Sequence, residues 1–212
     1  MGNLIDFTLN IDKHIINIVN NFGNWTYLIL FAVILIETGA VVLPFLPGDS
    51  LLFAAAALSA NASYSLNIWV FIGLFLLASI AGDSINFLLG KKVGTRLLDN
   101  RWVQKIIKPE HIDKTHHFFE KHGAAAIFLA RFMPIIRTLI PFVAATGKMK
   151  YKQFVTHNVP ACFAWVLICC GAGYFFGNIP FIQEHFSAVI LGIIAVSLLP
   201  AIIGVAKEKF SK

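Results

Sequence analysis

Charged residues are scarce in this chain. Only 13% of its 212 residues are Asp, Glu, Lys or Arg, whereas a soluble domain carries about 25%. Hydrophobic residues make up 58% and lie in long runs. These features exclude an ordinary soluble fold and predict one all-α integral membrane domain over residues 1–212, since helices satisfy their own backbone hydrogen bonds in lipid.

Acidic residues are scarcer than basic ones, at 11 against 17, which gives a net charge of +6. In a soluble protein this excess would favour a nucleic-acid partner. In a membrane protein, basic residues instead gather on the cytoplasmic side. We therefore expect a membrane partner and no nucleic acid.

Motifs for metals and for covalent catalysis are also lacking. The three cysteines share one apolar run and are interpreted as small hydrophobic residues. Histidines cluster in 111–122 without a zinc spacing, which favours a solvated or membrane-surface helix, with metal binding as the alternative. The cysteines are Cys162, Cys169 and Cys170. The histidines and acids of segment 111–122 are His111, Asp113, His116, His117, Glu120 and His122. No Ser-His-Asp, Cys-His or lipid-phosphatase arrangement stands out, so we expect no enzyme, no metal and no cofactor.

The apolar runs define the predicted segments. We predict an amphipathic interfacial helix at 1–24, apolar segments at 25–60, 67–90, 123–147, 153–178 and 186–206, and a polar segment at 91–122. Lysines and arginines concentrate in 91–122, in 148–152 and at the C-terminus, which places all three on the cytoplasmic side. The segments 61–66 and 179–185, with one charge between them, are predicted to lie outside.

This assignment constrains 123–147, which enters and leaves on the cytoplasmic side. About 20 residues cross a bilayer once, so 25 residues cannot cross it twice and a re-entrant hairpin is predicted. By the same argument, both ends of 25–60 lie outside, so this segment is predicted to be a hairpin that enters from the outside. The two opposed hairpins predict an inverted repeat around breaks near the midplane. Kinked spanning helices are the alternative.

Both predicted hairpins carry charges near a proline-rich break. The first contains Glu37 and Asp49, the second contains Arg131 and Arg137, and Asp83 follows in segment 67–90. Ionisable residues inside a membrane are candidate functional residues. Two buried ion pairs, between the two acids of the first hairpin and the two arginines of the second, are one interpretation. A phosphate between the arginines is the other, because guanidinium groups bind phosphate in a bidentate way, with the acids taking up protons. Asp83 is either a third proton-linked acid or a residue that hydrogen-bonds between helices.

Supporting residues are expected at the breaks and at the start of a later segment. Gly48, Asp49 and Ser50 are predicted to begin a helix, and Thr138 to cap another, so that helix amides face the phosphate. His157 and Asn158 are either interfacial or close to the arginines. The break residues with supporting roles are Pro44, Pro47, Gly48, Ser50, Pro134, Thr138 and Pro141.

Several of these stretches resemble the DedA family of bacterial inner-membrane proteins, which is related to the SNARE-associated Golgi (VTT-domain) proteins. The resemblance covers nearly the whole chain. Its carriers are ETGAVVLPFLPGDSLLFAAAAL from Glu37, GDSINFLLGKKVG from Gly82 and FFEKHGAAAIFLARFMPIIRT from Phe118, together with Gly147, Phe154, Asn158, Trp165 and GAGYFFG from Gly171.

The resemblance implies a multi-pass protein of the bacterial cytoplasmic membrane that carries a lipid. Some members resemble translocases of undecaprenyl phosphate that support cell-envelope synthesis, and others are linked to the proton-motive force. The family's membrane acids match Glu37 and Asp49, and its essential arginines match Arg131 and Arg137. The expected partners are a polyprenyl phosphate or another phosphorylated lipid, and protons, in a chain that is compatible with a homo-oligomer. A proton-dependent ion or drug antiporter and a general phospholipid scramblase are the alternatives.

Overall fold

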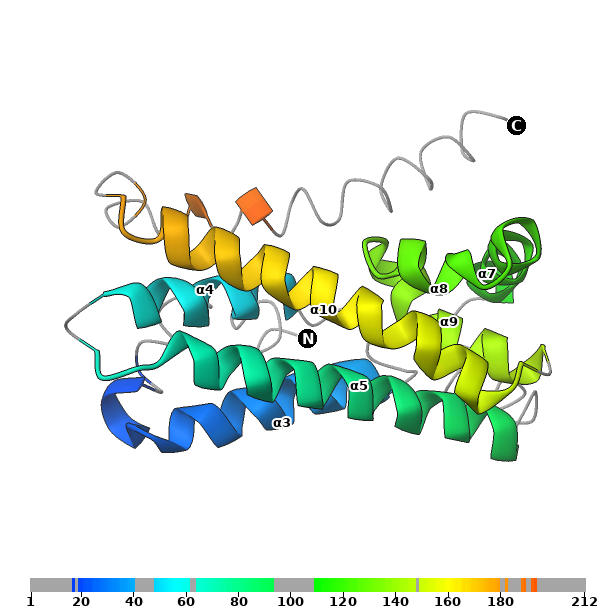
Figure 1. The fold of residues 1–212 in the computed structure, drawn as a ribbon, viewed down its shortest axis with the longest axis horizontal. Coiled ribbons are helices and arrows are strands. Elements are labelled where there is room, and N and C mark those ends of the chain that lie inside the picture. Colours follow the sequence, from blue (N-terminus) through cyan, green and yellow to red (C-terminus); the bar gives the residue numbers. More distant parts are fainter. Residues whose placement is uncertain are drawn as a thin grey trace. The chain divides into compact units, whose positions relative to one another are not determined.

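The fold was analysed in a computed structural model that describes residues 17, 19–40, 48–61, 64–93, 109–147, 149–179, 182, 188–189 and 192–193 (Figure 1). All regular elements in these residues are helices. They are α3 (Trp25–Gly39), α4 (Gly48–Ala60), α5 (Ile68–Val93), α7 (Pro109–His122), α8 (Ala125–Ala130), α9 (Pro134–Thr146) and α10 (Tyr151–Phe176). An all-α fold is therefore confirmed for the described part of the chain.

Helices α5 and α10 have 26 residues each. They are the two described helices that are long and apolar enough to cross a membrane, and they coincide with the predicted segments 67–90 and 153–178. Shorter apolar helices, α3 and α4, occupy the predicted first hairpin. Re-entrant hairpins and an inverted repeat stay predictions.

The chain divides into two compact units. Unit 1 comprises 1–33, 46–76 and 166–212, and unit 2 comprises 34–45 and 77–165. Within the described part of unit 1, α4 is almost wholly buried and rich in alanine. Gly173 on α10 and Gly177, which directly follows the end of the helix, bring this part of the chain against α4. A Cβ on Gly173 would lie 2.9 Å from the Cβ of Ala56, and one on Gly177 would lie 2.6 Å from the Cα of Ala57. Small residues at this crossing thus let two backbones approach closely.

Unit 2 has an aromatic core between antiparallel stretches of α5 and α10. The rings of Phe87 and Phe154 stack with their centroids 4.7 Å apart, and both residues are fully buried. Helix α7 packs on α8 and α9, and its chain leaves through Gly123, whose φ of 56° is the left-handed conformation that a helix end favours. The same core includes Ala126, Ile127, Ala130, Ile140 and Ala144.

The break between α8 and α9 places the two arginines. Proline at position 134 excludes the helical conformation for Met133, which is extended with φ −119° and ψ 103°. The amides of Arg131, Phe132 and Met133 each bond to the carbonyl three residues earlier, so the chain tightens before α9 begins. The predicted break between Arg131 and Arg137 is confirmed.

Two predictions about this break are wrong. Thr138 does not cap a helix, because α9 already begins at Pro134, and a proline is favoured in the first turn where its missing N–H is not needed. Pro141 does not interrupt the chain either. It lies inside α9, which continues to Thr146.

Other predictions fall partly or wholly outside the described residues. In the amphipathic segment 1–24, helix is described at 17 and 19–22 only, and most of 186–206 is not described. Pro44 and Pro47 lie in the undescribed stretch 41–47. The stretch ends where predicted, since α4 begins at Gly48 with Asp49 in its first turn.

Candidate functional site

A cluster of buried charges lies inside unit 2. The first pair joins helix α3 to helix α9: the Nη2 of Arg137 donates to the Oε1 of Glu37 at 2.5 Å. Glu37 is 1% exposed and Arg137 is 7% exposed. Such a charge-assisted bond in a buried place offsets much of the cost of burying each charge alone.

The second pair joins the α8–α9 turn to α5. Nη1 of Arg131 donates to Oδ2 of Asp83, and both side chains are buried. The Sγ of Cys162 on α10 lies 3.6 Å from the same carboxylate oxygen. The other two guanidinium nitrogens of Arg131, Nε and Nη2, are buried and have no hydrogen-bond partner in the described part of the chain.

Trp165 on α10 brings the two arginines together. The guanidinium carbon of Arg131 lies 4.6 Å from the indole centroid and that of Arg137 lies 5.1 Å from it. Both distances are within the range of a cation–π interaction, and together they keep the two guanidinium carbons within about 10 Å of each other. The pairing supports the prediction that the break makes the arginines converge.

Asn86 ties together the two helices that carry the first ion pair. Its Nδ2 donates to the carbonyl of Thr38 at 3.3 Å and to the carbonyl of Thr138 at 2.8 Å. These carbonyls belong to the residues directly after Glu37 and Arg137. One side chain of α5 therefore fixes the relative position of both partners.

Glycines on α5 allow this arrangement. A Cβ on Gly82 would lie 2.8 Å from the Cβ of Thr38, and one on Gly90 would lie 2.8 Å from the carbonyl oxygen of Phe142. Gly82, Asn86 and Gly90 are four residues apart and so share one face of the helix. Helix α3 approaches this face at Gly82, α9 approaches it at Gly90, and the amide lies between them.

The VTT domain model matches residues 46–175. Protein DedA of Escherichia coli is 48% identical over 206 residues, which cover 97% of this chain and 94% of the relative. The chain belongs to the DedA family. An uncharacterized membrane protein of Mycobacterium tuberculosis is 36% identical, with 88% of this chain and 81% of the relative covered. Inner membrane protein YghB of Escherichia coli is 29% identical, with 92% and 86% covered.

No solved structure matches this DedA-family chain. The names of the relatives support a membrane protein, in agreement with the two long apolar helices. The resemblance seen in the sequence is thus confirmed at the level of the family.

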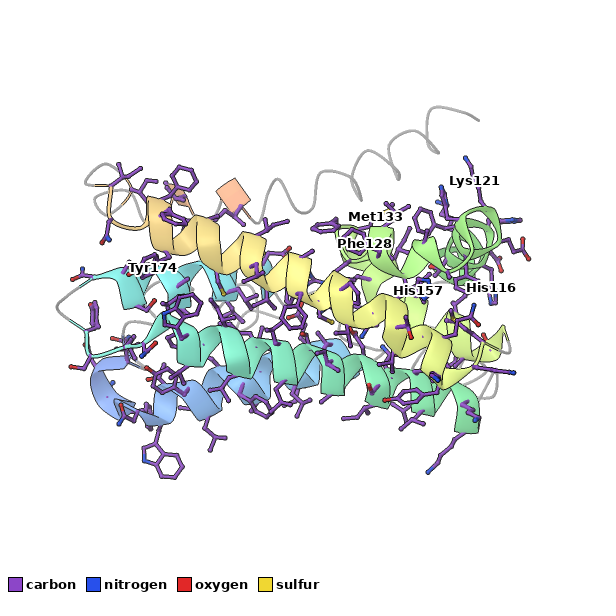
Figure 2. The ribbon with its side chains drawn as sticks, viewed as in Figure 1. His116, Lys121, Phe128, Met133, His157 and Tyr174 are labelled. Atoms are coloured by element: carbon purple, nitrogen blue, oxygen red, sulfur yellow. The ribbon has the colours of Figure 1, made fainter. Side chains whose placement is uncertain are left out.

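Several residues that the sequence predicts for the site of this DedA-family protein lie outside the cluster of buried charges. Asp49 and Ser50 lie in the first turn of α4, in unit 1. Asn158 is buried on the unit 2 stretch of α10. His157, labelled in Figure 2, lies beside it and has its Nδ1 2.9 Å from the carbonyl of Gln153 in its own helix.

The histidine-rich helix α7 lies at the surface of unit 2. His117 and Glu120 are 3.6 Å apart with both side chains largely exposed, and the Nδ1 of His122 is 3.0 Å from the carbonyl of Phe118. Figure 2 shows His116 and Lys121 on the same helix. Within the described ranges, no three His, Cys, Asp or Glu residues are grouped so as to hold a metal ion.

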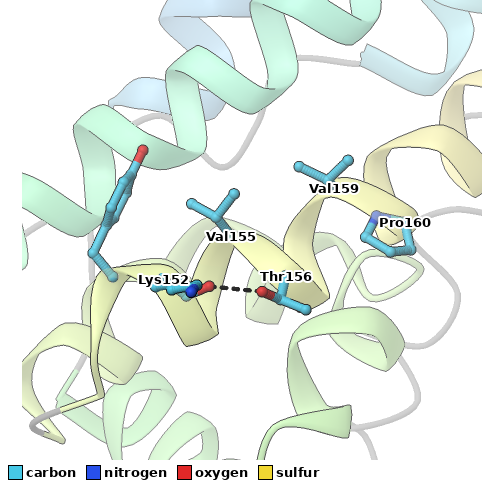
Figure 3. Close-up of a pocket in the computed structure, with 6 residues that line it drawn as sticks. Lys152, Val155, Thr156, Val159 and Pro160 are labelled. Carbon is cyan, nitrogen blue, oxygen red and sulfur yellow. Dashed lines mark hydrogen bonds between the residues drawn. The ribbon is translucent and has the colours of Figure 1, made fainter.

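A shallow hollow of about 500 Å³ lies along α10, and none of the cluster residues lines it (Figure 3). It follows the helix around Pro160, which cannot donate the usual backbone hydrogen bond. Thr156 uses its hydroxyl to bond the carbonyl of Lys152 at 2.8 Å. The hollow is lined by Tyr151, Lys152, Val155, Thr156, Val159 and Pro160.

Two members of the cluster were missed as site residues from the sequence. Asn86 and Trp165 occurred only inside the stretches that carried the family resemblance. A signal for Asn86 was present, since Gly82, Asn86 and Gly90 are spaced by four in an apolar run, the spacing of a close helix crossing. No local signal identifies Trp165, because an aromatic residue in a membrane helix is ordinarily a lipid or core contact.

Proposed function

We propose that this DedA-family protein translocates a phosphorylated lipid of the polyprenyl phosphate type across the bacterial cytoplasmic membrane, which it crosses several times. The observation that carries the proposal is that the Nε and Nη2 atoms of Arg131, which form one edge of its guanidinium group, are buried without a hydrogen-bond partner among the described residues. In a guanidinium group, Nε–H and Nη2–H point the same way, which is the geometry that receives two oxygens of one phosphate. Both atoms lie buried while Nη1 is held by Asp83.

Holding one edge of Arg131 has a physical consequence for the other. Asp83 keeps the side chain in one orientation, so little conformational entropy is lost when an anion binds. Trp165 covers the same guanidinium group by a cation–π contact. A charge that would be expensive to bury alone is thus kept in place, ready for an anion of the membrane.

Proton coupling follows from the charge balance. The two arginines are matched by Glu37 and Asp83, so an incoming phosphate adds negative charge to a neutral cluster. Uptake of protons by the carboxylates would restore neutrality, since a buried like charge favours the protonated form of an acid. Asp49, in the first turn of α4, is proposed as a further acid that takes up a proton.

The test is phosphate binding by Arg131→Lys in the purified full-length protein in lipid nanodiscs. Lysine keeps the charge and can still reach a carboxylate, but it lacks the planar edge. Loss of a charge-assisted bond of about 1.5–3 kcal/mol predicts about a 10- to 100-fold weaker affinity for a polyprenyl phosphate. The matched control is Lys91→Gln on α5, which removes an exposed charge and should bind as the unmodified protein does.

A second variant separates this function from a purely structural ion pair. In the charge-swapped double variant Glu37→Arg/Arg137→Glu the pair is kept but the charges exchange places. We expect this double variant not to transport the lipid phosphate in liposomes. Normal binding by Arg131→Lys, or transport restored by the swap, would contradict a phosphate site and favour an ion or drug antiporter.

A further inference from the structure

Asn86 has one atom that the ion-pair cluster does not use. The residue is fully buried on α5. Both hydrogens of its amide nitrogen are directed to backbone carbonyls, those of Thr38 and Thr138. The Oδ1 is also buried, and within the described residues it has no hydrogen-bond partner.

The two carbonyl bonds fix which way the amide faces. A flipped amide would point Oδ1 at two carbonyl oxygens and lose both bonds, so the hydrogen-bond network decides the orientation. Oδ1 is therefore held as an acceptor in a fixed position. A buried acceptor without a donor is costly, and in a native protein it calls for an explanation.

The donors of Arg131 and this acceptor belong to the same part of the cluster. Asp83, which binds Arg131, is three residues before Asn86 on α5. Side chains at this spacing lie on one face, with Cβ atoms about 5–6 Å apart. One turn of α5 thus carries both Asn86 and the carboxylate that holds Arg131, so the cluster combines the unpartnered N–H groups of Arg131 with the carbonyl acceptor of Asn86.

A ligand that satisfies both must carry acceptors and one donor. A phosphodiester and a doubly ionised phosphate monoester have acceptors only. A singly protonated monoester has two acceptor oxygens and one P–OH donor, and its single charge costs less to bury than two. Resting on the proposed function, we infer that the protein selects the monoanionic, protonated form of a phosphate monoester, with Asn86 accepting the hydroxyl proton. One proton then travels on the lipid headgroup itself.

The neighbouring titratable groups of unit 2 come from each helix around the cluster. They are Glu37 on α3, Asp83 on α5, Arg131 and Arg137 beside and on α9, and Cys162 on α10. A change in their charge with pH would alter the binding of any anion. A ligand without a P–OH group therefore serves as the control for their titration.

The experiment measures the affinity of dodecyl phosphate and dodecyl methyl phosphate for the full-length protein in nanodiscs between pH 5 and pH 8. The second compound is a diester that keeps one negative charge throughout. Because the second ionisation of a phosphate monoester lies near pH 6, selection of the monoanion predicts about a 100-fold loss of monoester affinity across this range. Diester affinity should change by less than about threefold.

The variant Asn86→Leu distinguishes the role of Oδ1 as an acceptor for the ligand from the role of Nδ2 in holding α3 and α9 together. Its loss of the two backbone bonds weakens both ligands alike, whereas loss of the acceptor lowers only the preference for the monoester. We expect the monoester-to-diester affinity ratio at pH 5 to fall about tenfold. Ser84→Ala, on the same helix, is the matched control and should keep the ratio.

The outcomes distinguish the two proposals. If neither ligand binds the unmodified protein, the phosphate site itself is wrong. If both bind but monoester affinity is constant or rises with pH, the phosphate site stands and selection of the protonated form is overturned. This arm needs no variant, so it decides the matter even if Asn86→Leu does not fold. An unchanged ratio in a folded Asn86→Leu protein would also overturn the role of Asn86.

Discussion

In both units glycines allow two helices to pack closely, but the residues buried at the two crossings differ in polarity. In unit 1, Gly173 of α10 and Gly177, directly after the helix, meet the alanine-rich α4. In unit 2, Gly82 and Gly90 of α5 meet α3 and α9, but Asp83 and Asn86 are placed between the glycines. The residues that the glycines of the first crossing meet are Phe53, Ala56 and Ala57, which are apolar, whereas the second crossing buries two ion pairs and an amide.

This difference separates packing from function. Small residues allow close helix packing in a membrane, and the contacts of Gly173 and Gly177 with α4 are of this kind. Buried ion pairs add little stability compared with apolar residues of similar size. We therefore propose that the charges of unit 2 serve ligand binding, and we expect stability and function to separate there when the charges are removed.

The largest effect is expected when one partner of a buried pair is removed. Asp83→Leu leaves Arg131 buried without its acid, which should lower the free energy of unfolding by about 3–5 kcal/mol. Asp83→Leu/Arg131→Met removes both charges and should recover most of that loss, yet bind no lipid phosphate. Chemical unfolding in detergent and a binding assay measure the two properties.

Leu52→Ala in unit 1 is the counterpart of this experiment. Leu52 is fully buried on α4, so a cavity should cost about 2–5 kcal/mol. Phosphate affinity of the folded fraction should be kept. If the Asp83/Arg131 double variant is as unstable as Asp83→Leu, or still binds phosphate, the contrast between the units does not hold.

A smaller effect is expected from adding one methyl group at each crossing. In Gly173→Ala the new Cβ would overlap the carbonyl oxygen of Phe53 and lie 2.9 Å from the Cβ of Ala56. In Gly82→Ala it would overlap the Oγ1 of Thr38 and lie 3.0 Å from the amide nitrogen of Gly39. Each should destabilise the protein by about 1–3 kcal/mol. Only Gly82→Ala should also weaken phosphate binding, because it displaces the chain next to Glu37.

Each of these helices offers its own control. A Cβ at Gly171 on α10 or at Gly73 on α5 would meet nothing within 4 Å. Alanine there should leave stability unchanged or raise it by about 0.5–1 kcal/mol, since glycine weakens a helix. Equal losses at all four glycines would show that helix propensity, and not close packing, decides the outcome.

The smallest effect is expected at the ring that both arginines face. Trp165→Phe keeps an aromatic surface but weakens the cation–π contacts, which predicts a loss of about 0.5–1 kcal/mol in stability and a few-fold weaker phosphate binding. Trp165→Leu should weaken both further. Phe163→Leu alters an exposed aromatic residue of the same helix, and we expect neither property to change.

Much of the fold was accessible from the sequence because it depends on composition and on local signals. Apolar runs of membrane length predicted α5 and α10, and Gly48 predicted the start of α4. Pro134 predicted the break between the arginines. The sequence places the start of α9 wrongly at Thr138, because threonine is a common helix cap, whereas the proline four residues earlier is itself a strong first-turn residue.

The sequence by itself determined that this chain is helical, belongs in a membrane and carries a few charges that lipid cannot solvate. Only the tertiary structure decided how those charges combine: Glu37 with Arg137, Asp83 with Arg131, and both arginines over Trp165. These partners are separated by 100 and 48 residues in the pairs. No local sequence pattern encodes such a pairing, because the pairs form only between helices that approach each other closely. The glycines of α5 and the residues of α3 and α9 that they contact determine that approach.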